Sequence, residues 1–117
     1  MPILFLVELF SGTGSFSTAA EEEARQNGYT LKKLSVDIHP KYNPSTCIDI
    51  RAWNYKQAVT DFLQEGLGPS DVLWVHASPP CNEYSLAKTS HPRDLEFADS
   101  LVQQALKIIT YCAPHFW

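Results

Sequence analysis

The sequence predicts an α/β fold built on an open, mostly parallel sheet. The segment 3–9 is an almost continuous apolar run, which is typical of a strand buried on both faces. Further segments of strand length alternate with segments of helical spacing, and this alternation favours parallel strands joined by helical crossovers. A turn with two glycines, 12–14, follows the first strand. Glycine permits backbone conformations there that larger residues avoid.

The first half of the chain yields three strands and one helix. A helix is predicted over 15–27, because acids lie early in it and Gly28 follows it. The second strand, 29–36, ends at Asp37. Prolines then interrupt regular structure, and a short third strand is expected over 46–50.

The second half continues the alternation. We expect a helix over 55–65, a fourth strand over 71–77 and a long helix that Pro92 opens and that ends near residue 113. The long helix has the clearest periodicity in the chain. Its apolar residues are at positions 95, 98, 101, 102, 105, 108, 109 and 112. The segment 115–117 resembles the start of another buried strand.

Composition limits the classes of protein that fit. A length of 117 residues predicts a single domain, 1–117, and 44% apolar with 19% charged residues excludes a disordered chain. A net charge of −4 gives no indication of a surface that binds nucleic acid, because such a surface needs a basic patch. The apolar N-terminus is too short to span a membrane, so we expect a cytoplasmic protein without a membrane partner.

The cysteines predict a reducing compartment. There are three of them, Cys47, Cys81 and Cys112, without a CxxC spacing. An odd number and this spacing argue against a disulfide framework and against a metal site. For Cys47 and Cys112 we expect a structural role.

The residues that could bind a ligand or take part in catalysis lie at or just after the ends of predicted strands. They should therefore meet at the carboxyl edge of the sheet, where ligands bind in such folds. The glycine turn follows the first strand, Asp37 ends the second, Asp49 lies in the third and Cys81 follows the fourth. A glycine turn paired with an acid at the end of the second strand indicates a cofactor that contains adenosine, because the acid can accept both ribose hydroxyls. These residues do not identify which cofactor it is.

Cys81 follows two prolines, which fix the backbone before the thiol and can hold its direction. A thiol aimed at the cofactor edge suggests a nucleophile. The alternative is a small buried cysteine in a loop.

Two motifs resemble those of the cytosine-5 DNA methyltransferases. Glu8–Phe16 (ELFSGTGSF) is similar to the first motif of that family, and Ser78–Ser85 (SPPCNEYS) is similar to its Pro-Cys catalytic motif. The segments 35–38 and 47–50 resemble the second and third motifs. The family usually has Gln where this chain has Asn82.

The resemblance implies a three-layer, Rossmann-like methyltransferase fold with S-adenosylmethionine as cofactor. The implied cofactor residues are Phe10, Ser11, Gly12, Thr13, Gly14, Asp37, Ile38, Asp49, Ile50 and Pro80. Backbone groups of the glycine turn would hold the methionine part, Asp37 the ribose, and Ile38 and Ile50 the two faces of adenine. Asp49 would accept from the adenine amine, and Leu101 would border the pocket.

The catalytic residue that the resemblance implies is Cys81, whose thiolate would add to carbon 6 of a cytosine flipped out of DNA. The residues that would contact the base are Pro80, Asn82, Tyr84 and Ser85.

Compared with the family, the chain resembles an N-terminal portion, truncated after about the fourth strand. We therefore expect it to be inactive alone, to bind DNA only through the complete enzyme, and to form a homodimer through an exposed sheet edge. The alternatives are a non-catalytic S-adenosylmethionine-binding module, one subunit of a split methyltransferase, or a nucleotide-binding domain of another enzyme type in which Cys81 is structural.

Overall fold

The computed structural model describes residues 2–64, 66–79 and 95–117. It has a four-stranded parallel sheet with the strand order β3-β2-β1-β4. In chain order, the elements are β1 (Ile3–Leu9), α1 (Ser15–Gln26), β2 (Thr30–Asp37), the 3-10 helix η1 (Pro40–Tyr42), β3 (Thr46–Cys47), the 3-10 helix η2 (Ile50–Ala52), α2 (Tyr55–Leu63), β4 (Val72–Ala77) and α3 (Leu95–Cys112).

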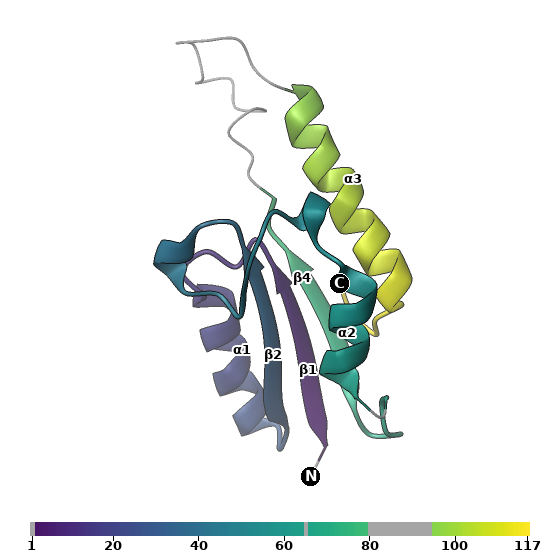
Figure 1. Cartoon of the computed structure of the whole chain (residues 1–117). Coiled ribbons are helices and arrows are strands. Elements are labelled where there is room, and N and C mark those ends of the chain that lie inside the picture. Colours follow the sequence, from purple (N-terminus) through teal and green to yellow (C-terminus); the bar gives the residue numbers. More distant parts are fainter. Residues whose placement is uncertain (1, 65, 80–94) are drawn as a thin grey trace.

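The sheet lies between α1 on one face and α2 with α3 on the other, which makes three layers (Figure 1). The chain runs outward from β1 to β2 and β3, then returns to the other side of β1 to form β4. Crossovers between parallel strands are right-handed. Because the direction of travel across the sheet reverses, right-handed crossovers place the helices on opposite faces.

The main core lies between the sheet and the pair α2 and α3. The β1 residues Phe5, Val7 and Leu9 belong to it, together with Leu101 and Ile108 of α3. Successive residues of a strand point to opposite faces, so the β1 residues between these face α1. β1 is therefore buried on both faces, as its almost continuous apolar run predicts.

The predicted helices and strands are present in the described residues, and most of their ends differ from the prediction by one or two residues. The predicted start of the long helix at Pro92 lies outside the described residues. The third strand was predicted wrongly as 46–50, because β3 contains only Thr46 and Cys47. Asp49 does not lie in it but caps η2, where its side chain accepts a hydrogen bond from the Arg51 amide at 2.9 Å. The physical reason is the connection 38–45, which is shorter than a full parallel crossover and contains two prolines.

The residues after α3 run along the outer edge of β4. Phe116 forms a parallel bridge with Trp74, and the His115 amide donates to the Leu73 carbonyl at 2.9 Å. The Leu73 amide in turn donates to Nδ1 of His115 at 3.0 Å. The segment 115–117 thus pairs with the sheet, but the prediction that it is buried is wrong, since Phe116 is 59% and Trp117 is 75% exposed.

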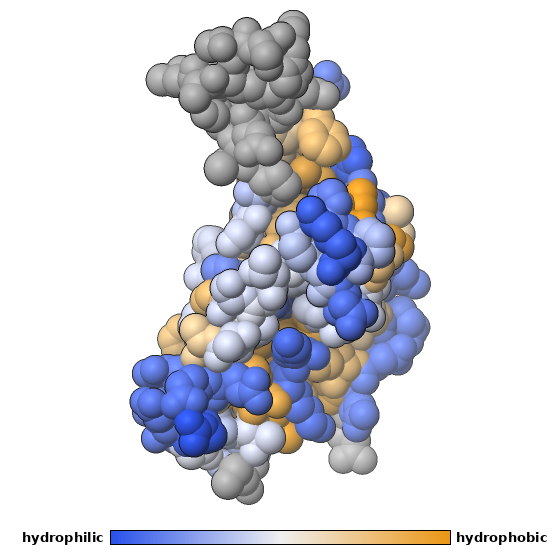
Figure 2. Space-filling view, turned by 90° about the vertical axis from the view of Figure 1, so that its left-hand side faces the viewer, coloured by the Kyte–Doolittle hydropathy of each residue, from blue (hydrophilic) through white to orange (hydrophobic). Residues whose placement is uncertain are grey.

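On the side drawn in Figure 2, hydrophilic residues alternate with residues of intermediate hydropathy and with separate hydrophobic areas. Within the described segments, the large hydrophobic residues that are exposed are Ile38, Leu67, Leu95, Phe97, Leu106, Tyr111, Phe116 and Trp117. No helix in those segments has the length and apolar content needed to cross a bilayer.

The packing of α3 on the sheet can be tested with a matched pair of substitutions. Ile108 is fully buried, whereas Leu106 on the same helix is 41% exposed. We expect Ile108→Ala to lower the free energy of unfolding by about 2–5 kcal/mol, since it leaves a cavity in the core. Leu106→Ala should change it by less than about 1 kcal/mol. Urea unfolding measures both, and equal losses would contradict this packing.

Self-association through the sheet edge stays a prediction. Among the described residues, the outer edge of β4 is paired only around the Trp74–Phe116 bridge, and Trp117 beside it is exposed. Edges of this kind tend to pair with another chain. Light scattering after size exclusion should detect a twofold dimer that Trp117→Lys weakens and Leu106→Lys does not. A monomer at every concentration would show that the edge is already protected.

Candidate functional site

A pocket of about 420 Å³ opens where the strands end. Its lining comes from the end of β2, from the segments that follow the four strands and from the first turns of α3. The lining residues are Phe10, Val36, Asp37, Ile38, His39, Ile48, Asp49, Ile50, Ser78, Phe97 and Leu101. This volume lies in the ~300–1,000 Å³ range of small-molecule sites. The pocket brings together five predicted cofactor residues, and Leu101 borders it.

The turn after β1 has the left-handed backbone conformations that its two glycines predict. Phe10, Gly12 and Gly14 have positive φ angles of 57°, 52° and 81°. The positive φ of Gly12 favours glycine at this position. A Cβ atom built on Gly12 would meet no atom within 4 Å, so there is open space above the turn. Phe10 lines the pocket, whereas Ser11, Thr13 and both glycines are not among its lining residues.

The side chain of Asp37, the last residue of β2, is hydrogen-bonded to the turn after β1. Its carboxylate is buried and accepts from the Gly12 amide through Oδ2 and from the His39 amide through Oδ1, both at 2.8 Å. An ionised carboxylate has about four acceptor positions. Two amide donors therefore leave Asp37 with the capacity to accept further hydrogen bonds from a ligand in the pocket.

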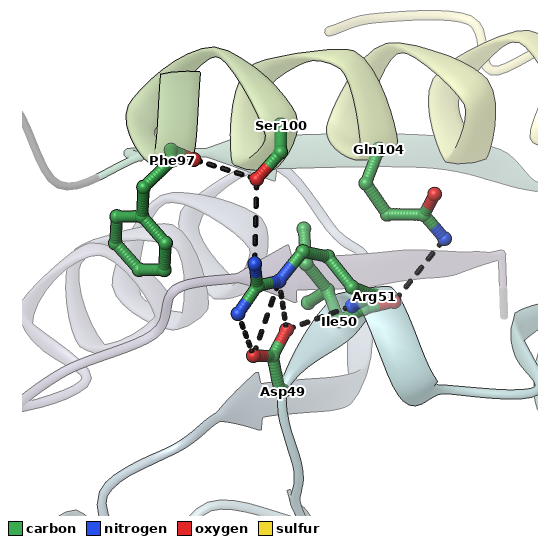
Figure 3. Close-up of polar contacts among 6 residues, drawn as sticks. All are labelled: Asp49, Ile50, Arg51, Phe97, Ser100 and Gln104. Atoms are coloured by element: carbon green, nitrogen blue, oxygen red, sulfur yellow. Dashed lines mark hydrogen bonds and ion pairs between the residues drawn. The ribbon is translucent and has the colours of Figure 1, made fainter. Parts of the chain in front are cut away.

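Asp49 has a different environment, which sequence reasoning missed. Arg51 forms an ion pair with it, with Nη2 at 2.6 Å from Oδ2 (Figure 3). The hydrogen bonds from Arg51 lower the pKa of Asp49, and the same contact raises the pKa of Arg51. Both carboxylates line the pocket, but only the one of Asp49 is neutralised by a neighbouring cation in the described segments.

Glu8, within the motif 8–16, is the second unexpected feature. Its side chain is buried, and no described residue donates a hydrogen bond to its Oε1. In the strand register it lies between Ser35 and His76. The His76 ring stacks on Phe16 with centroids 3.6 Å apart, and burial lowers the pKa of His76 although Glu8 opposes that shift. Glu8 does not line the pocket.

A second cavity, also about 420 Å³, lies between α1 and the sheet. It is lined by Leu4, Ala20, Glu23, Ala24, Asn27, Tyr29, Val72, Trp74 and Phe116. Its strand residues come from the amino-terminal and middle parts of β1 and β4, whereas ligands of parallel sheets bind at the carboxyl ends. Its lining is also poor in polar groups, so the pocket at the carboxyl ends is the better candidate site.

Five predicted site residues fall outside the described segments. They are Pro80, Cys81, Asn82, Tyr84 and Ser85. The other two cysteines do not form a site. Cys47 is exposed, its Sγ 3.5 Å from the Ile38 carbonyl, and burial raises the pKa of Cys112 to about 11. Across the described segments, no group of three or more His, Cys, Asp or Glu side chains could hold a metal ion.

Several lining residues escaped the sequence analysis. Phe97 lies four residues before Leu101, so helical spacing could have placed both on one side of α3. His39 and Ile48 adjoin predicted residues and could have been inferred as neighbours. Arg51 does not line the pocket but pairs with Asp49, and it had no sequence signal because its contacts depend on α3 coming close to η2.

No family model, no curated protein and no solved structure matches this chain. The functional interpretation therefore depends on the pocket and on the sequence motifs whose residues line it.

Proposed function

We propose that the chain is the part of an S-adenosylmethionine-dependent DNA cytosine-5 methyltransferase that binds the cofactor and carries the nucleophile. One observation carries this proposal: residues implied by three separate motifs line the same pocket. Phe10 comes from the first motif, Asp37 and Ile38 from the second, and Asp49 and Ile50 from the third.

The topology supports the finer assignment of a Rossmann-like methyltransferase fold. The order β3-β2-β1-β4 has its switch point between β1 and β4, and the site lies at the carboxyl ends of these parallel strands. Helices on both faces of the sheet agree with that assignment (Figure 1).

The pocket residues fit an adenosine-containing cofactor. Asp37 retains acceptor capacity for the ribose hydroxyls, and Ile38 and Ile50 provide apolar walls for a flat base. The open space above Gly12 leaves room for the methionine part beside the turn. S-adenosylmethionine, when bound, would supply an electrophilic methyl group.

The proposed nucleophile is Cys81, which lies outside the described segments. As a thiolate it would add to carbon 6 of cytosine, which makes carbon 5 nucleophilic. Once carbon 5 has taken up the methyl group, loss of the carbon-5 proton and departure of the thiolate would restore the aromatic ring. Pro80 would position the thiol, and the residues Asn82, Tyr84 and Ser85 would contact the base. The DNA would be bound by the complete enzyme.

The cofactor proposal is tested by calorimetry with S-adenosylhomocysteine. We expect the wild-type protein to bind it and Asp37→Ala to bind it at least about tenfold more weakly, because a hydrogen bond to a charged group contributes about 1.5–3 kcal/mol. Asp61→Ala is the matched control, since Asp61 is exposed on α2 and does not line the pocket.

Circular dichroism verifies that the Asp37 variant is folded, and Asp37→Asn provides a milder second variant. Equal affinity of wild type and Asp37→Ala would contradict the ribose assignment. Binding of NADH without binding of S-adenosylhomocysteine would contradict the family.

Cys81 is tested by mapping iodoacetamide labelling under native conditions. We expect Cys81 to react first, because a nucleophile near a cofactor site is held accessible. Cys112 should react last, since its pKa of about 11 keeps it protonated. Bound S-adenosylhomocysteine should change the rate at Cys81 and leave Cys47 unaffected. Faster labelling of Cys47 or Cys112 would count against a poised nucleophile.

A further inference from the structure

The carboxyl end of β4 is followed by a serine whose hydroxyl is held by a histidine. Oγ of Ser78 lies 3.0 Å from Nε2 of His76, and Ser78 lines the pocket at the strand ends. The His76 ring is fixed in turn, since it stacks on Phe16 of α1 with an angle of 5° between the two ring planes. Ser78 therefore presents a positioned hydroxyl to the pocket.

The hydrogen bond to His76 leaves the Ser78 hydroxyl able to accept from a ligand. A hydroxyl has one donor and two acceptor positions. If Oγ donates to the imidazole, both acceptor positions stay open, and if the imidazole donates to Oγ, one of them does. In either arrangement this bond leaves at least one acceptor position for an N–H donor of a ligand.

The charges beside Ser78 favour a cationic donor. His76 lies opposite Glu8 in the register of β4 with β1, and the Glu8 side chain is buried, its Oε1 without a donor among the described residues. Burial lowers the pKa of His76 more than the charge of Glu8 raises it, so the imidazole is neutral at neutral pH. A neutral imidazole does not repel a cation at Ser78, and the charge of Glu8 attracts one.

The strand order determines which part of a ligand reaches Ser78. Along the order β3-β2-β1-β4, the pocket is lined in turn by Asp49, Asp37, Phe10 and Ser78. A nucleoside with its ribose at Asp37 and its base toward β3 extends its 5′ substituent in the other direction, toward β1 and β4. In S-adenosylhomocysteine that substituent is the amino acid part, whose ammonium is a cationic N–H donor.

We propose that Ser78 is a further ligand-binding residue, which accepts a hydrogen bond from the ammonium of the cofactor's amino acid part, and that His76 is its positioning residue. This inference rests on the proposed function, since it assumes that S-adenosylmethionine or its demethylated product occupies the pocket. It adds a side-chain contact after β4 to the backbone contacts expected from the turn after β1.

Calorimetry with S-adenosylhomocysteine and its desamino analogue, which lacks the ammonium and keeps the carboxylate, tests the inference. We expect Ser78→Ala to weaken binding of S-adenosylhomocysteine at least about fivefold and to leave binding of the analogue within about twofold of wild type. His76→Phe should have the same effect, because phenylalanine keeps a ring to stack on Phe16 but cannot hold the hydroxyl. His76→Gln retains a hydrogen-bonding group and should restore most of the affinity.

Ser70→Ala is the matched control, because Ser70 is exposed in the turn before β4, at the opposite end of that strand. It should bind both compounds as the wild type does. Combining Ser78→Ala with His76→Phe should weaken binding no further than either substitution alone, since both remove the same contact.

Three results would overturn the inference alone: an unchanged affinity of Ser78→Ala, an equal loss for both compounds in that variant, or a His76→Gln variant as weak as His76→Phe. If the wild type bound neither compound, the proposed function would fail, and the inference with it.

Discussion

The register of β1 with its two neighbours is the constraint on which the rest of the structure depends. β1 pairs in parallel with β2 on one side and with β4 on the other, and Leu9 lies opposite both Val36 and Ala77. The three strands therefore end at one level of the sheet. This alignment brings the turn after β1 next to Asp37, so that the Gly12 amide can donate to its carboxylate. A shift of the register by one residue would turn the apolar residues of β1 to the opposite faces and would separate the turn from Asp37.

The two pocket carboxylates illustrate how surroundings decide the role of a residue. Asp37 is fixed by backbone amides, which orient the side chain without neutralising its charge. Asp49 is fixed by a guanidinium, whose hydrogen bonds lower its pKa and keep it ionised to lower pH than usual. The ion pair with Arg51 thus persists as the pH falls until Asp49 is protonated, below the usual range for an aspartate. Both acids were predicted from the sequence at strand ends, but only the folded chain shows that backbone amides hold Asp37 and that a guanidinium holds Asp49.

The sequence was sufficient for the elements whose pattern is long and local. The apolar spacing of α3 placed Ala98, Leu101, Ala105 and Ile108 on one side, and all four are buried. The apolar run of the second strand likewise predicted that Asp37 lies at the end of β2, and the structure has it there. The short β3 and the contact between Arg51 and Phe97 depend on how distant segments approach each other, which local patterns do not encode.

Ligand-induced changes in the amide resonances of the protein test the central claim most directly. In ¹H–¹⁵N spectra recorded while S-adenosylhomocysteine is added, we predict that the affected amides cluster at 10–14, 37–39, 48–51 and around Phe97 and Leu101, which lie in or next to the pocket. Amides of Leu4, Ala24 and Val72, at the cavity under α1, should not shift. Shifts confined to that second cavity, or an unchanged spectrum at millimolar ligand, would contradict a cofactor site at the carboxyl ends of the strands.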